Sequence, residues 1–236
     1  MKKRVFAVCS GSGGVGKSTF ALAVAMGAAS SGMQTILLDA SGASRSCDLM
    51  LGMESIVALD LTDVLSGQAS LSHAIYRVPQ RDKLQYCCTS LLGSIPFGEF
   101  AGIVLALRSM CDILVIDLPT GELALADGLL GEDDARICLA RPDDASLRSM
   151  ERIWMRISGE KAQRHIILSR IKREAVKRGL QYSEETAAQI LDSLITGCVF
   201  EDEDLAAKVG KERAGFLPTS RARAQLDQII RKLLME

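Results

Sequence analysis

The ten residues SGSGGVGKST (10–19) decide the fold, because they contain a complete phosphate-binding pattern. They match GxxxxGK[ST] from Gly11 to Ser18, after a short apolar run and before a helical pattern, which is the context that such a loop requires. Glycines let the backbone turn so that successive N–H groups point at phosphate oxygens, and the helix adds the positive end of its dipole. We expect Lys17 to neutralise the β- and γ-phosphates and Ser18 to ligate Mg²⁺. The residues expected to bind the nucleotide here are Gly11, Ser12, Gly13, Gly14, Val15, Gly16, Lys17, Ser18 and Thr19.

Short β-type runs alternate with helical patterns along almost the whole chain. Several runs are apolar throughout, as expected of strands that are covered on both faces. The alternation predicts an α/β fold with a mostly parallel, twisted sheet of about seven or eight strands and helices on both faces. No linker or internal repeat interrupts the pattern, so residues 1–236 are expected to form a single nucleotide-binding domain. The predicted strands are Val5–Ser10, Thr35–Asp39, Leu84–Cys88, Ile113–Asp117, Arg136–Ala140, His165–Ser169 and Ile195–Phe200, and the helical patterns include Lys17–Ser30, Ala145–Ser158 and Ser183–Ser193.

A second part of the site lies in the stretch DILVIDLPTG (112–121). Asp117 follows four apolar residues, and Pro119 and Gly121 then end the strand. A carboxylate at this position lies at the carboxyl edge of the sheet, where open α/β folds bind their ligands. We therefore expect Asp117 to hold the magnesium ion through water.

The composition is that of a globular protein with reduced thiols. Among 236 residues, 48% are hydrophobic and 24% are charged, and the formal net charge of −1 gives no general indication of nucleic-acid binding. No apolar run approaches the roughly 18–20 residues of a membrane span, and the apolar stretch after the basic start is shorter than the roughly 7–15 residues of a secretory signal. The seven cysteines show no metal-binding spacing and are expected to be buried filler in a cytoplasmic protein.

The C-terminal stretch SRARAQLDQIIRKLLME (220–236) has an apolar helical face. We expect a final helix packed on the sheet; the alternative is a helix that lies on a membrane surface, because basic residues occupy its polar positions. The apolar face consists of Leu226, Ile229, Ile230, Leu233 and Leu234.

Together these stretches resemble the MinD/ParA family of deviant P-loop ATPases, and MinD more closely than ParA, over nearly the full length. GSGGVGKST is close to the family's GKGGVGKTT, and TILLDASGASRSCDLMLG is similar to the MinD stretch that runs from a strand-end aspartate, here Asp39, to an LDLxxG box. LTDVLSGQASLSHAI resembles the helix pair that follows. VIDLPTG resembles the DSPAG switch, ARPDDASLRSMERI resembles NPEVSSVRDxxRI, and CVFEDEDL stands in the place of IPED. Each stretch alone is weak evidence, but their order and spacing together are strong.

The resemblance implies a mechanism. Relatives bind ATP and Mg²⁺ and form face-to-face dimers, in which a signature lysine of the loop reaches the partner's phosphates, and hydrolysis dissolves the dimer. Such a timer positions a division septum, a plasmid or a surface organelle. Carried over to this chain, Ser18, Asp39 and Asp117 would form the metal site, and Lys17, Asp39 and Asp117 would be the catalytic residues.

Two positions depart from the family pattern. Ser12 replaces the signature lysine, and Ser41 replaces the second acidic residue of the switch, which orients the attacking water in relatives. A cation delivered in trans to a transferring phosphoryl group is worth roughly 10³–10⁵ in rate. We therefore expect intact nucleotide and metal binding with weak or partner-dependent ATP hydrolysis.

The base-contacting positions of relatives correspond here to Ser169, Arg170, Phe200, Glu201 and Asp202. Phe200 stands where proline is usual, which can change how adenine stacks. We expect ATP rather than GTP, because the guanine-specific NKxD signature is absent from the sequence.

The leading hypothesis is a MinD-like spatial regulator that works as a nucleotide-dependent homodimer with an unidentified protein partner. The alternatives are a non-hydrolysing ATP-binding scaffold, similar to the TadZ/CpaE pilus-localisation proteins, and a ParA-like DNA partitioner. Relatives carry an amphipathic membrane tail past the last helix, and because this sequence ends without one, membrane attachment by that route is not expected. DNA binding is also not expected, since the acidic run 201–204 precedes the candidate basic patch. That patch consists of Lys208, Lys211, Arg213, Arg221 and Arg223.

Overall fold

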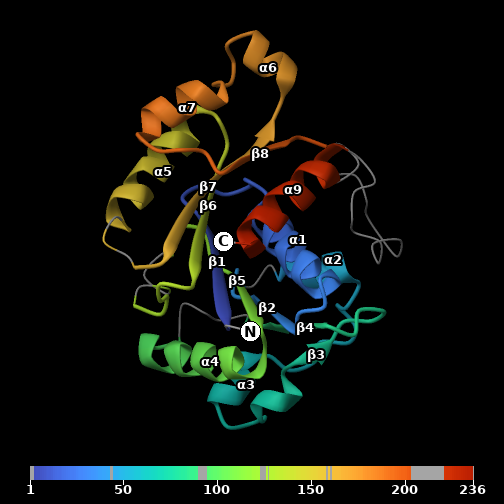
Figure 1. Cartoon of the computed structure of the whole chain (residues 1–236). Helices are drawn as coiled ribbons and strands as arrows, with labels where there is room; N and C mark the ends of the chain where they lie inside the picture. The colour runs from blue at the N-terminus through green and yellow to red at the C-terminus, as the bar shows by residue number, and fades with distance from the viewer. Residues whose placement is uncertain are drawn as a thin grey trace.

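The computed structural model of the chain describes residues 3–42, 45–89, 95–122, 126, 128–157, 159, 161–202 and 221–235. It contains one twisted eight-stranded sheet with helices on both faces (Figure 1). The strands are β1 (Arg4–Ser10), β2 (Thr35–Asp39), β3 (Tyr76–Arg77), β4 (Leu84–Cys88), β5 (Ile113–Asp117), β6 (Ala135–Ala140), β7 (Gln163–Ile171) and β8 (Gly197–Phe200). The helices are α1 (Lys17–Ser30), α2 (Ser46–Leu51), α3 (Leu61–Leu65), α4 (Phe97–Met110), α5 (Asp144–Arg156), α6 (Arg173–Lys177), α7 (Glu184–Leu191) and α9 (Arg221–Met235), with a 3₁₀ turn at Leu71–His73.

The strand order places a ligand crevice at the end of β1. The strands lie in the order β3-β4-β2-β5-β1-β6-β7-β8, and all neighbours are parallel except β3, which runs antiparallel to β4. β5 lies on one side of β1 and β6 on the other, so the connections change direction at β1. In open α/β sheets such a switch point opens a crevice at the carboxyl ends of the strands.

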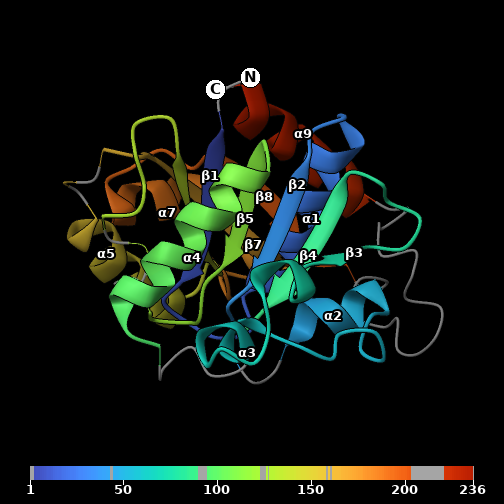
Figure 2. The same ribbon diagram turned by 90° about the horizontal axis from the view of Figure 1, so that it is seen from below.

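Two apolar layers hold the sheet, one against each face. On one face, Phe6 and Val8 of β1 pack in a cluster with residues of α1 and α9. On the other face, Val5, Ala7 and Cys9 join a cluster with residues of α4, α5 and α7. Figures 1 and 2 show these two helical layers from two directions. Because both faces are covered, the central strands are buried along their length, which explains their unbroken apolar runs.

The expected fold class is confirmed, and so are the seven predicted strands, with changes at their ends. Residues Thr35–Asp39, Leu84–Cys88 and Ile113–Asp117 form strands with the predicted bounds. β7 extends beyond the predicted range at both ends, whereas β8 begins at Gly197 rather than at residue 195. The two-residue strand β3 was not predicted, because two residues are too short for a period-2 pattern.

The last helix packs on the protein interior, as expected from its apolar face. Leu226, Ile229, Ile230 and Leu233 of α9 are at most 6% exposed, and they lie against α1 and β8. Two glycines permit this close contact: a Cβ on Gly27 would lie 2.7 Å from Ile230 Cγ2, and one on Gly197 would lie 2.5 Å from Ile229 Cγ1. The apolar face is therefore used for internal packing rather than for a membrane surface. None of the helices in the described part of the chain combines the length and apolar character that crossing a bilayer requires.

The α1–α9 contact leads to a stability prediction. The substitution Gly27→Ala should lower the free energy of unfolding by about 1 kcal/mol, because overpacking of about 1–3 kcal/mol against Ile230 exceeds the gain in helix propensity. Gly102→Ala in α4 is the matched control, since an added Cβ there meets nothing within 4 Å. It should raise the free energy of unfolding by about 0.5–1 kcal/mol. Urea denaturation measures both, and equal effects of the two substitutions would contradict the tight contact.

Candidate functional site

The loop between β1 and α1 has a backbone that requires glycine at two positions. Gly14 and Gly16 have φ angles of +69° and +83°, in the left-handed region that favours glycine. A Cβ added at Gly13 or Gly16 would meet nothing within 4 Å, so space beside the loop is open there. Gly16 is also the N-cap of α1 and has no side chain with which to satisfy the first helical N–H groups. The loop thus presents helix N–H donors to an open space.

A buried ion pair joins this loop to the centre of the sheet. Lys17 is 7% exposed, and its Nζ lies 2.5 Å from Oδ1 of Asp117, which is fully buried at the end of β5. Burial raises the pKa of the Asp117 carboxyl above its usual value; Lys17 opposes this shift, and the nearby charge of Asp39 adds to it. Lys17 is therefore the cation that offsets part of the cost of burying the Asp117 carboxylate.

The second buried carboxylate, Asp39, is held by hydrogen-bond donors. It lies beside Asp117 in the register of β2 and β5. Its Oδ1 accepts hydrogen bonds from the Ser41 N–H (3.0 Å) and the Ser41 hydroxyl (2.5 Å), and its Oδ2 accepts them from the Cys47 N–H (3.0 Å) and the Tyr86 hydroxyl (3.5 Å). Ser41 therefore contacts the carboxylate directly.

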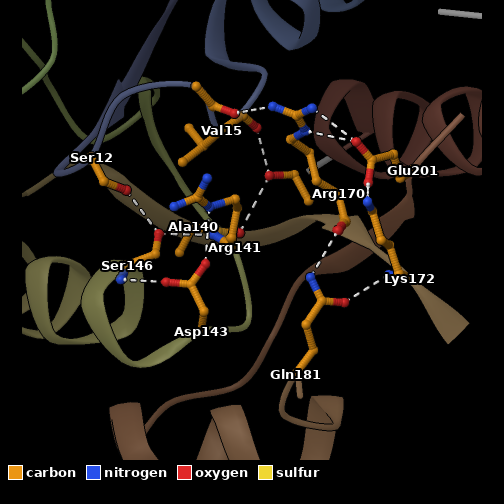
Figure 3. Close-up of polar contacts among 12 residues, drawn as sticks. Ser12, Val15, Ala140, Arg141, Asp143, Ser146, Arg170, Lys172, Gln181 and Glu201 are labelled. Atoms are coloured by element: carbon orange, nitrogen blue, oxygen red, sulfur yellow. Dashed lines mark hydrogen bonds and ion pairs between the residues drawn. The ribbon is translucent and has the colours of Figure 1, made fainter. Parts of the chain in front are cut away.

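Ser12 and Gly11 fasten the first half of the loop to α5. The Ser12 hydroxyl lies 2.8 Å from the Ser146 hydroxyl in the first turn of this helix (Figure 3). Ser149, one turn further on, donates to the Gly11 carbonyl at 2.7 Å. A Cβ on Gly11 would collide with the Ser149 hydroxyl, so this contact requires glycine at position 11. Position 12 thus holds a neutral side chain that is engaged within its own chain.

A cavity of about 230 Å³ opens beside the second half of the loop. One of its lining residues, Ser169, donates from its hydroxyl to the Val15 carbonyl at 2.6 Å and lies 3.3 Å from the Ala140 carbonyl. Apolar and polar groups both face the cavity, as is usual for small-molecule sites. It is lined by Val15, Gly16, Thr19, Phe20, Leu139, Ser169, Arg170, Val199, Phe200, Glu201, Asp202 and Leu226.

An arginine–glutamate pair spans this cavity and the loop. Arg170, with a φ of +55°, donates from Nη1 to the Gly14 carbonyl (2.7 Å) and from Nη2 to Oε1 of Glu201 (2.8 Å). Lys172 Nζ lies 3.1 Å from the other Glu201 oxygen, Oε2 (Figure 3). Partial burial would raise the pKa of Glu201, but the hydrogen bonds from Arg170 and Lys172 outweigh this and lower it. The pair ties the end of β8 to the phosphate-binding loop.

The structure brings the predicted residues into one region in two groups. The loop from Gly11 to Thr19 lies with Asp39 and Asp117 on one side. Ser169, Arg170, Phe200, Glu201 and Asp202 line the cavity on the other side, together with Thr19. Of the candidate basic patch, Lys208, Lys211 and Arg213 lie outside the described residues, as does the side chain of Arg221, and Arg223 pairs with Asp227 at 3.6 Å.

Several residues near the loop were not predicted from the sequence, among them two that contact Asp39 and two that hold the loop to α5. Cys47 and Tyr86 contact Asp39, and Ser146 and Ser149 contact the loop. Cys47 is fully buried; that burial and the charges of Asp39 and Asp117 raise the pKa of its thiol well above the usual range. Nothing in the sequence distinguishes these residues from ordinary core and helix positions, because their contacts are made between distant segments.

The glycine-rich loop joins a central strand to a helix, its lysine is buried against a carboxylate, and two strand-end carboxylates lie side by side at the switch point. These features define a P-loop NTPase. Comparisons with known proteins agree. Residues 1–75 match the family model described as ParA: NUBPL iron-transfer P-loop NTPase. The septum site-determining protein MinD of Escherichia coli strain K12 is 30% identical over 217 residues, covering 86% of this chain and 80% of that protein.

Solved structures agree with the sequence comparison. The MinC:MinD cell division protein complex of Aquifex aeolicus matches with a TM-score of 0.86 and 25% identity, covering 99% of this chain and 96% of that one. MinD of Pyrococcus horikoshii OT3, complexed with Mg-ADP, matches with a TM-score of 0.79 and 20% identity, covering 99% and 96%. The chain belongs to the MinD/ParA family of P-loop ATPases.

The buried ion pair leads to a prediction about stability and pH. The substitution Lys17→Met should lower the free energy of unfolding by about 3–5 kcal/mol, because it leaves the Asp117 carboxylate buried without its cation. Adding Asp117→Asn should recover part of this loss, since the remaining group carries no charge. Urea denaturation of the two variants measures the difference.

The penalty of Lys17→Met should also depend on pH. The pKa of Asp117 is raised in the folded protein, and more so without Lys17, so the cost of the charge is present above the folded pKa and is relieved as the pH falls through it. The destabilisation should therefore be smaller at about pH 5 than at about pH 8. In the Lys17→Met/Asp117→Asn control this difference should vanish. A penalty that is the same at both pH values would contradict the assignment of a charged Asp117.

Proposed function

We propose that the chain is an ATP-binding spatial regulator of the MinD kind, a switch that dimerises with ATP and Mg²⁺ and hydrolyses ATP weakly by itself. In this proposal, residues 1–236 act as one nucleotide-binding domain. One observation carries it: the loop keeps its buried lysine paired with Asp117, whereas Ser12 and Ser41 are uncharged and engaged within the chain. Phosphate binding would be kept, and the charges that speed hydrolysis would be missing.

The residues around the loop suit a nucleotide with its cation. The N–H groups of the loop and Lys17 would hold the phosphates, while Ser18, Asp39 and Asp117 would hold Mg²⁺. Two fully buried carboxylates beside a single ammonium group leave negative charge for a divalent ion to balance. When bound, the ion would neutralise phosphate charge as a Lewis acid.

The cavity beside the loop is the proposed site of the base. Its size and its position next to Val15 and Gly16 suit a heterocycle whose phosphates extend over the loop. Phe200 would offer a stacking face, and Arg170 would hold the cavity wall through Glu201. We propose adenine rather than guanine, because the sequence lacks the guanine-specific NKxD signature.

Weak hydrolysis follows from the two serines. Ser12 cannot deliver the cation that relatives bring to the partner's phosphates, a contribution of roughly 10³–10⁵ in rate. Ser41 has a hydroxyl in place of a carboxylate, and both this hydroxyl and the Ser41 N–H already bind Asp39. Ser41 would therefore be a poor group for orienting a water molecule. The two losses act on the same step and are not additive.

The first test is ATP turnover at saturating Mg²⁺, with nucleotide binding recorded on the same sample. We expect saturable binding of ATP and turnover far below that of a MinD protein that carries both charged residues, measured in parallel. Size-exclusion chromatography with ATP and with ADP should give a dimer with ATP alone. Turnover equal to that of the parallel MinD protein, without any partner, would contradict weak hydrolysis, and absence of binding would contradict the whole proposal.

A gain-of-function variant tests the cause of the weak turnover. Ser12→Lys combined with Ser41→Asp should raise kcat at least about tenfold, because it restores the trans-acting cation and the water-orienting carboxylate. Ser12→Ala is the control, since it breaks the Ser146 contact without adding charge, and it should leave kcat low. An unchanged kcat in the double variant that still binds ATP would mean that these two positions do not limit hydrolysis.

A second candidate function is a non-hydrolysing ATP-dependent scaffold of the TadZ/CpaE kind. The neutral contacts of Ser12 and Ser41 favour it as well, because both hydroxyls are engaged in holding the loop and Asp39. The two candidates separate on turnover with the cellular partner added: the switch cycles and the scaffold does not. A DNA partitioner would instead be retained on non-specific DNA in a salt-dependent manner.

A further inference from the structure

We propose that Cys47 adds a sulfur ligand to the carboxylates of Asp39 and Asp117, so that the three side chains form a site for one thiophilic divalent cation such as Zn²⁺. The inference deepens the proposed function and rests on it for the role of a cation at this place. The ligand set itself is a property of the nucleotide-free chain.

Three separate elements bring the ligand atoms together. Asp39 ends β2, Asp117 ends β5, and Cys47 is the second residue of α2. All three side chains are fully buried, and one ligand atom from each lies within 4.8 Å of the other two. Metal sites are built from such convergence of carboxylate and thiol groups rather than from neighbouring residues on one surface.

The two oxygens of the Asp117 carboxylate can bind Lys17 and a metal cation at the same time. Its Oδ1 pairs with Lys17, whereas its Oδ2 lies 3.9 Å from the Cys47 Sγ. A tetrahedral cation with metal–sulfur bonds of about 2.3 Å and metal–oxygen bonds of about 2.0–2.2 Å holds its sulfur and oxygen ligands about 3.5–3.7 Å apart. The 3.9 Å between Asp117 Oδ2 and Cys47 Sγ exceeds this by only a few tenths of an ångström, so a small side-chain adjustment would bring the pair to a shared ion.

The Asp39 carboxylate also presents an oxygen on the side of the cysteine. Its Oδ2 accepts the Cys47 N–H at 3.0 Å, while the Tyr86 hydroxyl is a distant donor at 3.5 Å. An ionised carboxylate oxygen has two acceptor sites, so one of them can turn to a cation without loss of the N–H bond. That bond also fixes the start of α2, and with it the position of the thiol.

Charge and chemistry select the class of ion. Two carboxylates, one thiolate and the Lys17 ammonium sum to −2, which a divalent cation balances in a buried site. On binding, the S–H bond breaks, the proton goes to solvent, and an Sγ–metal bond forms. Thiolate ligands favour zinc-like ions, whereas Mg²⁺ prefers oxygen ligands alone.

Cadmium chloride, added to the reduced, nucleotide-free full chain, tests the site. A thiolate–cadmium charge-transfer band in the ultraviolet should rise to saturation at one Cd²⁺ per chain. Cys47→Ala should remove the band and weaken Cd²⁺ binding at least about tenfold. Cys198→Ala is the matched control: this thiol is more exposed and lies in β8, and the band should remain unchanged.

Two further checks separate the loss of the metal site from the loss of the fold. Circular dichroism establishes that each variant is folded, and Cys47→Ser, which is nearly the same shape, should also lose the band. A band absent from the wild type, or one that persists in Cys47→Ala, overturns the inference. Mg²⁺–ATP binding on the same samples separates the two proposals: ATP binding without the cadmium site overturns this inference alone, and a cadmium site without ATP binding overturns the proposed function alone.

Discussion

The ion pair between Lys17 and Asp117 is the interaction on which the rest of the site depends. It joins the first residue of α1 to the last residue of β5, and both partners are almost completely shielded from water. Separating them would leave an uncompensated charge in the interior, which is far more costly than the net gain from the pair itself. The pair therefore does little for overall stability but fixes where the loop, the helix and the sheet meet. In the proposed nucleotide complex, the phosphates would compete with Asp117 for this ammonium group.

The two buried carboxylates are stabilised by different means, and this difference divides the site. Asp117 relies on a full positive charge, whereas Asp39 relies on N–H and O–H donors from Ser41, Cys47 and Tyr86. These donors satisfy the oxygens of Asp39 without a counter-ion, whereas Lys17 pairs with Asp117. Ser41 is a donor to the Asp39 carboxylate, at the position where the sequence resemblance implies a second carboxylate. Two carboxylates at this separation would repel each other, so a serine here avoids that cost.

Much of the site could be predicted because its chemistry is local in sequence. The loop from Gly11 to Ser18 has a fixed pattern, and Asp117 ends an apolar run, so each is recognisable without knowledge of the fold. The contacts of Tyr86 and Ser146 could not be predicted in this way. Tyr86 sits in an apolar strand and reaches Asp39 because β2 and β4 are neighbours, although β3 lies between them in sequence. Strand order of this kind follows from crossover connections, which sequence periodicity does not encode.

The contact between the loop and α5 bears on how the proposed switch would work with a neutral residue at position 12. The Ser12 hydroxyl meets the Ser146 hydroxyl in the first turn of α5 (Figure 3). The Gly11 carbonyl accepts a hydrogen bond from the Ser149 hydroxyl one turn later. A lysine at position 12 would carry a mobile charge on a long stem, strongly hydrated and free to leave for a phosphate. A short hydroxyl cannot leave without giving up its partner, and it gains no electrostatic energy by doing so. The first half of the loop is thus held to α5 by neutral hydrogen bonds whose strength barely depends on the charge of a bound nucleotide. Any signal that passes from the nucleotide to α5 in this chain must therefore travel through the geometry of the loop backbone, and not through the transfer of a cation.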